Sequence, residues 1–76
     1  MDDLKGEKIL YLQKNRTGAE GELDDGRKII FRVRLGRWYV GTGNNYKAAW
    51  NNLVDLGGLG IRSVDDAVKF LGMELV

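Results

Sequence analysis

The fold is decided by the stretch Lys28-Ile29-Ile30-Phe31-Arg32-Val33-Arg34-Leu35. Every second residue of this stretch is apolar, in the series Ile29, Phe31, Val33 and Leu35. Between them lies a second, mostly basic series: Lys28, Ile30, Arg32 and Arg34. Side chains alternate between the two faces of a β-strand, so the pattern predicts a strand whose apolar series faces a core and whose basic series faces solvent.

Turn residues on both sides of this strand predict an antiparallel meander. Asp25-Gly26 is typical of a hairpin turn, because glycine readily adopts the positive φ that a type I′ turn requires, and residues 19–23 would form the partner strand. Residues 8–13 are rich in strand formers and are closed by turn residues 15–18. Residues 37–40 predict another strand, which we expect to end at a turn, Gly41-Thr42-Gly43.

The apolar period changes after Asn44. Tyr46, Ala49, Trp50 and Leu53 recur at steps of three and four residues, which predicts a helix capped by Asn44 or Asn45 and continuing toward Leu56 or Gly57. The glycines of residues 57–60 would stop it. A second helix is expected over Val64–Leu71, with Ser63 and Asp66 as a capping box in which Asp replaces the usual Glu. Its buried side would hold Val64, Ala67, Val68 and Leu71.

These elements predict one α+β domain over residues 1–76, an antiparallel meander of three to four strands with two C-terminal antiparallel helices on one sheet face. The other face is expected to be open. The inward side chains would be Ile29, Phe31, Val33, Leu35, Trp38 and Val40, and Trp50 is likewise expected in the core. The open face would present Tyr11, Ile30, Arg32, Arg34, Arg37 and Tyr39.

Composition argues against catalysis and bound cofactors. The 76 residues include no Cys and no His, so a thiolate nucleophile, the commonest general base and the commonest metal ligand are all missing. We expect a non-enzymatic protein with no cofactor, no metal and no small-molecule substrate. Residues 1–12 contain no long apolar run, so we expect neither a signal peptide nor a membrane span, no membrane partner, and a cytoplasmic location.

Charge is unevenly distributed along the chain, although the net charge is only +1. Residues 1–26 carry seven acids against four bases, whereas residues 27–47 carry six bases and no acid. The open face therefore combines arginine with tyrosine, residues that are typical of interaction surfaces, since Arg offers a rigid fork of donors and Tyr a large contact area. We interpret Tyr11, Ile30, Arg32, Arg34, Arg37 and Tyr39 as a partner-binding surface.

Two glycine motifs are better explained as turns than as phosphate sites. Gly58-Leu59-Gly60 resembles the helix-hairpin-helix turn that approaches DNA phosphate, but Asp65 and Asp66 at the following helix start would repel a phosphate. Gly41-Thr42-Gly43 lacks the third glycine and the strand context of a nucleotide fingerprint.

Three short segments carry a resemblance to a known family: Lys8-Ile9-Leu10-Tyr11-Leu12, Gly26-x-Lys28-Ile29-x-x-Arg32-Val33, and Trp50 followed by Leu56-Gly57-Gly58-Leu59-Gly60. In this order they resemble the small phage-encoded anti-CRISPR proteins, in particular the type I-F inhibitors that bind the backbone subunit of the crRNA-guided surveillance complex. The resemblance implies a four-stranded antiparallel sheet under two antiparallel helices. It also implies an inhibitor that coats its target so that DNA cannot pair with the guide.

One contact position of that family is matched and two are changed. Tyr11 stands where the family has an aromatic contact residue, whereas Leu23 replaces an aromatic and Arg34 replaces an acid. Our first hypothesis is therefore a phage or prophage inhibitor that docks on a protein subunit of a host CRISPR-Cas type I surveillance complex and blocks binding of target DNA.

Two other hypotheses remain open. A small sheet-face module for double-stranded DNA, of integrase-arm or AP2-like type, would lay Arg32, Arg34 and Arg37 in the major groove. Against direct nucleic-acid binding stand the net charge of only +1 and the acidic flanks of the basic stretch. A virion structural or assembly protein has no positive feature in the sequence.

Overall fold

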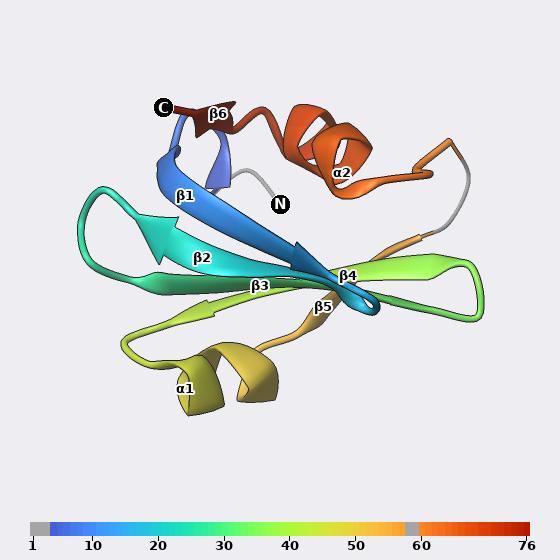
Figure 1. The fold of residues 1–76 in the computed structure, drawn as a ribbon, viewed down its shortest axis with the longest axis horizontal. Helices are drawn as coiled ribbons and strands as arrows, with labels where there is room; N and C mark the ends of the chain where they lie inside the picture. Colours follow the sequence, from blue (N-terminus) through green and yellow to red (C-terminus); the bar gives the residue numbers. More distant parts are fainter. Residues whose placement is uncertain (1–3, 58–59) are drawn as a thin grey trace.

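The structure is a computed structural model that describes residues 4–57 and 60–76. These residues form six strands and two short α-helices (Figure 1). In chain order the elements are β1 (Lys8–Asn15), β2 (Gly18–Leu23), β3 (Lys28–Arg34), β4 (Arg37–Gly43), α1 (Tyr46–Asn51), β5 (Val54–Gly57), α2 (Val64–Leu71) and β6 (Glu74–Leu75). The strands make one sheet in the order β5-β4-β3-β2-β1-β6, antiparallel except for the parallel pair β1 and β6.

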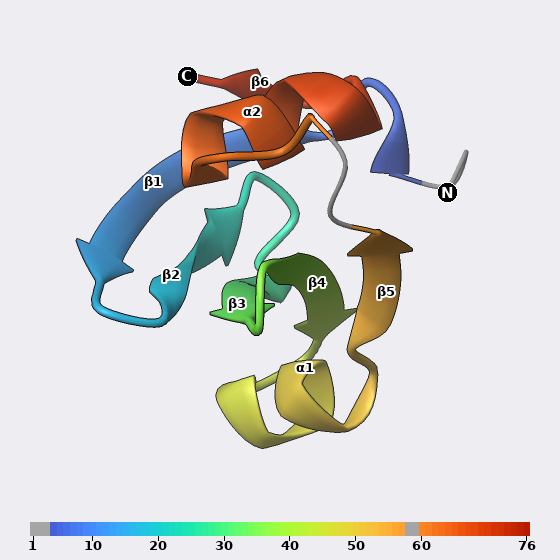
Figure 2. The same cartoon turned by 90° about the vertical axis from the view of Figure 1, so that its right-hand side faces the viewer.

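The sheet curls into a half-barrel, and α2 lies across its concave side (Figure 2). A change of register in the β1–β2 ladder, between Ile9 and Tyr11, marks an irregularity of the kind that bends a strand. Because the strands curve around α2, the concave side holds the core. Its largest fully buried side chains come from four strands: Ile9, Leu23, Ile29, Phe31 and Val40.

The expected fold class is wrong in strand number and in the placement of the helices. The described chain has six strands in a mixed sheet, not three to four in an antiparallel meander. The two helices do not share a face, because α1 lies below the sheet and α2 above it (Figure 1). The face that we expected to be open therefore carries α1, and we call it the outer face.

The first helix is much shorter than its apolar period predicts. It ends at Asn51, and residues 54–57 form β5 on the edge of β4. Two consecutive asparagines, Asn51 and Asn52, are poor helix formers, and β-branched Val54 favours an extended backbone. The position of Leu56 is compatible with the spacing of apolar residues in a helix and with that in a strand. In the structure it is a strand residue and packs against the core.

The second helix has the predicted bounds and the predicted buried residues. Its inward side chains are Val64, Ala67, Val68 and Leu71. The hydroxyl of Ser63 accepts a hydrogen bond from the Asp66 amide at 3.1 Å, and the Asp66 carboxylate accepts one from the Arg62 amide at 3.0 Å. The cap is therefore a variant of the predicted box, reaching one residue further back. Gly58 and Leu59 of the predicted glycine-rich turn lie outside the described residues.

Two further local expectations are wrong. Residues 41–43 continue strand β4 instead of forming a turn. Leu35 does not face the core but is 93% exposed, because the hairpin between β3 and β4 turns at Leu35 and Gly36. Ile29, Phe31, Trp38 and Val40 are buried as predicted, and Val33 packs against the same core.

Candidate partner-binding surface

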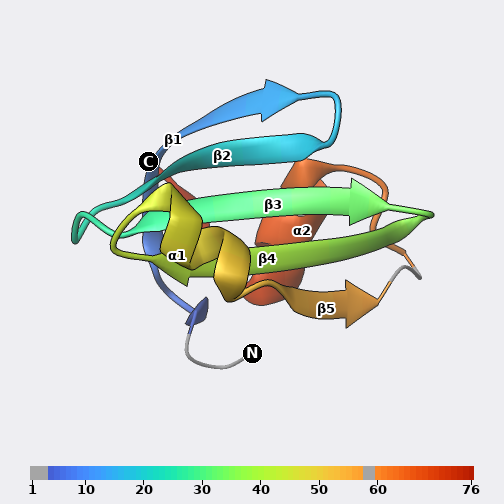
Figure 3. The same ribbon diagram turned by 90° about the horizontal axis from the view of Figure 1, so that it is seen from below.

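A groove lies on the outer face, in the half of the sheet that ends at the β3–β4 turn. It has a volume of about 260 Å³ and is lined by Arg32, Arg34, Tyr39 and Leu53. We call these four residues the outer-face groove. On this face, helix α1 covers the start of β3 and the end of β4 and leaves the ribbon near the β3–β4 turn uncovered (Figure 3). The groove therefore occupies the part of the outer face beside α1.

Arg32 connects the groove to α1 through a cation–π contact. Its guanidinium carbon lies 4.7 Å from the centroid of the Trp50 ring. The neighbour of Arg32 on β2 is Gly18, which has no side chain, and its neighbour on β4 is Tyr39. Arg32 thus has room to lie against the helix. Trp50 is 42% exposed, so the expectation that it belongs to the core is wrong.

The two arginines at the end of the hairpin differ in their partners. The Arg37 guanidinium donates two hydrogen bonds to the Asp55 carboxylate of β5, at 2.8 and 3.0 Å. Hydrogen bonds from the Gly57 amide and from Arg37 hold the pKa of Asp55 below its ordinary value. Arg34 is exposed and has no acidic partner among residues 4–57 and 60–76. Of the two, Arg34 is the one whose charge is available to a partner.

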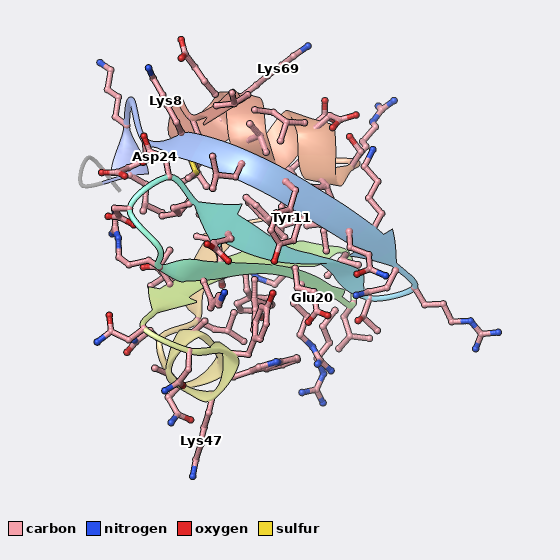
Figure 4. All side chains as sticks on the ribbon, turned by 60° about the vertical axis from the view of Figure 1, so that its left-hand side comes forward. Lys8, Tyr11, Glu20, Asp24, Lys47 and Lys69 are labelled. Carbon is pink, nitrogen blue, oxygen red and sulfur yellow. The ribbon has the colours of Figure 1, made fainter. Side chains whose placement is uncertain are left out.

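Tyr11 lies on the same outer face but belongs to a second cluster at the other end of α1. Interaction with the Tyr11 side chain, with some burial, raises the pKa of Tyr46 to about 12. The Lys28 ammonium sits 5.7 Å from the centre of the Tyr46 ring and also pairs with Glu22. We call Tyr11, Glu22, Lys28 and Tyr46 the tyrosine cluster. In Figure 4, Tyr11 and Glu20 lie over the sheet, whereas Lys47 points away from it.

The structure therefore brings together four of the six predicted binding residues and separates two. Arg32, Arg34, Arg37 and Tyr39 lie on neighbouring positions of β3 and β4. Ile30 was expected to face solvent but is only 3% exposed, because it lies on the strand face that α1 covers. Tyr11 is 46% exposed in the tyrosine cluster.

Sequence reasoning missed Trp50 and Leu53 as surface residues. The helical period assigned both to a core, and that assignment depended on both helices packing on the same sheet face. One signal pointed the other way: Gly41 and Gly43 leave the outer face of β4 without side chains, as close contact with a helix requires.

The described residues contain no site of other obvious chemistry. No group of three or more His, Cys, Asp or Glu residues in this part of the chain is arranged to hold a metal ion. Within the same residues, every buried side-chain nitrogen and oxygen has a hydrogen-bond partner. No helix among them is long and apolar enough to cross a membrane.

Comparison with known proteins found no relative. No protein-family model matches the sequence, and neither the curated proteins nor the solved structures contain a match to this chain. The outer-face groove and the short sequence resemblance are therefore the features that bear on function.

Proposed function

We propose that this protein is a non-enzymatic inhibitor that docks on a partner protein through the outer-face groove. The observation that carries the proposal is the contact between Arg32 and Trp50, next to Arg34 and Tyr39, on an accessible part of the surface. Arg, Trp and Tyr are the residue types that most often dominate protein–protein binding energy. A surface with this composition suits a partner that offers acidic side chains beside apolar ones.

The partner that we propose is a protein subunit of a type I CRISPR surveillance complex, in the cytoplasm of an infected or lysogenic bacterium. Three residues of the family resemblance, Tyr11, Lys28 and Arg32, have side chains on the outer face. The two-helix fold that the resemblance implies is contradicted by the structure. The choice of target therefore rests on these side chains alone, and the docking mode is this protein's own.

Protein docking accounts for the outer face better than insertion into duplex DNA. A sheet that lies in the major groove must present its strands directly, but α1 stands on β3 and β4. In addition, Arg37 is already paired with Asp55, and Arg32 is stacked on Trp50. Two of the three arginines that a DNA-binding module would use are thus held by the protein itself.

The experiment measures binding of the purified 76-residue chain to a purified type I-F surveillance complex, together with the effect on target DNA binding. Arg34→Glu should weaken binding by about tenfold or more, because it reverses the available charge of the groove. Lys47→Glu is the matched control: it makes the same change in net charge on α1, where the side chain points away from the sheet (Figure 4). Its affinity should stay within about twofold of the wild type.

Three results would contradict the proposal. Failure of the wild-type protein to bind any type I complex would remove the proposed target. Equal losses for Arg34→Glu and Lys47→Glu would show that binding follows net charge and not the groove. Tight duplex binding that falls with a log–log salt slope of about −4 would replace protein docking by DNA binding.

A further inference from the structure

Leu35, at the tip of the β3–β4 hairpin, has a backbone conformation that does not suit its side chain. Its φ is +52°, and it is the one non-glycine residue with a positive φ among residues 4–57 and 60–76. Gly36, the next residue, has φ +77°, so both central positions of this two-residue turn are left-handed. Asn-Gly and Asp-Gly usually fill such turns, because a leucine Cβ crowds the following carbonyl.

The other hairpins of the chain use conventional turn residues. The β1–β2 connection is made by Arg16 and Thr17 with Asn15 before them, and Asn15 Oδ1 accepts a hydrogen bond from the Thr17 amide at 2.9 Å. The β2–β3 connection uses Asp25 and Gly26. Among the hairpins of residues 4–57 and 60–76, only the β3–β4 tip has a large apolar residue in place of a polar one.

Folding does not explain this leucine, since the side chain is 93% exposed. The residue therefore adds backbone strain without contributing to the core. The turn requires a left-handed backbone at this position, but it does not require a leucine there. Residues held in strained conformations cluster at functional sites. Leu35 follows Arg34 directly, so it stands next in the chain to a residue that lines the outer-face groove.

Basic residues stand close to the tip in the chain and in the sheet. The Val33 amide donates a hydrogen bond to the Thr17 carbonyl at 2.7 Å, which places the β1–β2 turn, with Arg16, beside the end of β3. Arg34 and Arg37 flank the tip on its own hairpin. Arg37 is paired with Asp55, so Arg34 is the residue beside the tip whose charge is available. An exposed leucine next to an available guanidinium complements an apolar pocket with an acidic group at its rim.

We propose that Leu35 is an apolar anchor that enters such a pocket on the partner protein, while Arg34 pairs with an acidic group at the rim. The proposal rests on the proposed function and extends the docking surface from the outer-face groove over the hairpin tip. A protein pocket is favoured over a membrane or a DNA base step, because Leu35 directly follows Arg34, which lines a groove together with Tyr39 and Leu53.

The test is Leu35→Asn in the 76-residue chain, with affinity for a purified type I-F complex and melting temperature measured on the same sample. Asn tolerates the left-handed conformation, so the melting temperature should rise. Affinity should nevertheless fall by about tenfold, because the anchor is lost. Leu75→Asn is the matched control: it makes the same change at an exposed leucine of β6, on the far edge of the sheet from β4 and β5, and should leave affinity unchanged.

Binding by the wild type, Arg34→Glu and Leu35→Asn distinguishes the role of Leu35 as an anchor from docking through the outer-face groove. If Arg34→Glu weakens binding and Leu35→Asn does not, the anchor is wrong and the groove stands. If the wild-type protein does not bind the complex, both proposals fall. If the wild-type protein binds phosphatidylserine vesicles or duplex DNA and Leu35→Asn abolishes that binding, the tip serves a membrane or DNA and the protein pocket is wrong.

Discussion

Gly41 of β4 lies directly beneath Ala49 of α1, so closely that a Cβ on Gly41 would come within 2.0 Å of the Ala49 carbonyl oxygen. At Gly43 a Cβ would lie 2.6 Å from the Cβ of Ala48. The short helix therefore rests on bare backbone of the strand. This contact places Trp50 over Arg32 and covers Ile30, so the shape of the outer face depends on two glycines.

Gly41→Ala should destabilise the protein and displace α1. Neither the backbone of the helix nor that of the strand can yield by 1 Å at no cost, and we expect a loss of about 1–3 kcal/mol in the free energy of unfolding. The measurement is chemical denaturation together with amide NMR shifts. Gly36→Ala is the comparison, because it is also destabilising, through its positive φ, but has nothing within 4 Å of the added Cβ. Only Gly41→Ala should shift the amides of α1, and unchanged α1 amides would contradict the contact.

Phe31→Ala should cost far more stability than Arg32→Ala. Phe31 is 1% exposed in the concave core, and truncating a buried aromatic typically costs about 3–5 kcal/mol, which is much of the stability of so small a domain. Arg32 lies on the outer face, where its truncation removes only the contact with Trp50. Thermal melting of the two variants checks the strand register, and equal losses would show that the register is wrong.

The sequence correctly predicted those elements in which the spacing of apolar residues fits only one kind of secondary structure. The alternation in Lys28–Arg34 permits one strand register, and the spacing of Val64, Ala67, Val68 and Leu71 permits one helix face. Leu53 and Leu56 follow a helical step after Trp50, but they also fit an extended chain, so periodicity could not decide where α1 ends. The end of α1 is determined by the pairing of β5 with the edge of β4, which is a tertiary contact.

The candidate site was predictable only in part for the same reason. Strand alternation correctly placed Arg32, Arg34 and Tyr39 together on one face. It could not reveal that α1 packs on that face, which moves Ile30 out of reach and brings Trp50 to the surface. Leu35 was assigned to the core because the alternation was continued into the turn, although Gly36 follows it.

High pH should destabilise the protein partly through Tyr46. Its pKa is raised from 10.0 to about 12 by interaction with the Tyr11 side chain and by burial, so the folded state favours the neutral phenol. This contribution is fully present below pH 10 and is lost as the pH rises through about 12. The pKa of Lys28 is also raised, by its hydrogen bond with Glu22, and that contribution is lost in the same direction.

Tyr46→Phe isolates the phenol's contribution to this pH dependence. In a tyrosinate absorbance titration, the wild type should show a step near pH 12 that is missing from the variant. The loss of unfolding free energy between pH 10 and about 12 should also be smaller in the variant, whereas the part due to Lys28 stays. Identical titrations for the two proteins would show that Tyr46 does not carry the raised pKa.

Tyr11 tests whether the docking surface reaches beyond the outer-face groove, and two variants separate the roles of its ring and its hydroxyl. Tyr11→Ala removes an aromatic side chain that is 46% exposed, so affinity for a type I-F complex should fall by about tenfold if the ring is a contact. Tyr11→Phe keeps the ring, so it should bind within about twofold of the wild type. It removes the hydroxyl that raises the pKa of Tyr46, however, and should bring that pKa back toward 10.0.

The two readouts distinguish a contact from a structural role. Loss of binding in Tyr11→Phe as well as in Tyr11→Ala would mean that the Tyr11 hydroxyl, and not the ring alone, is needed for docking. Unchanged binding in Tyr11→Ala would confine docking to the groove and the hairpin tip, because the tyrosine cluster lies at the opposite end of α1. In that case the aromatic position shared with the anti-CRISPR family would have no part in recognition by this protein.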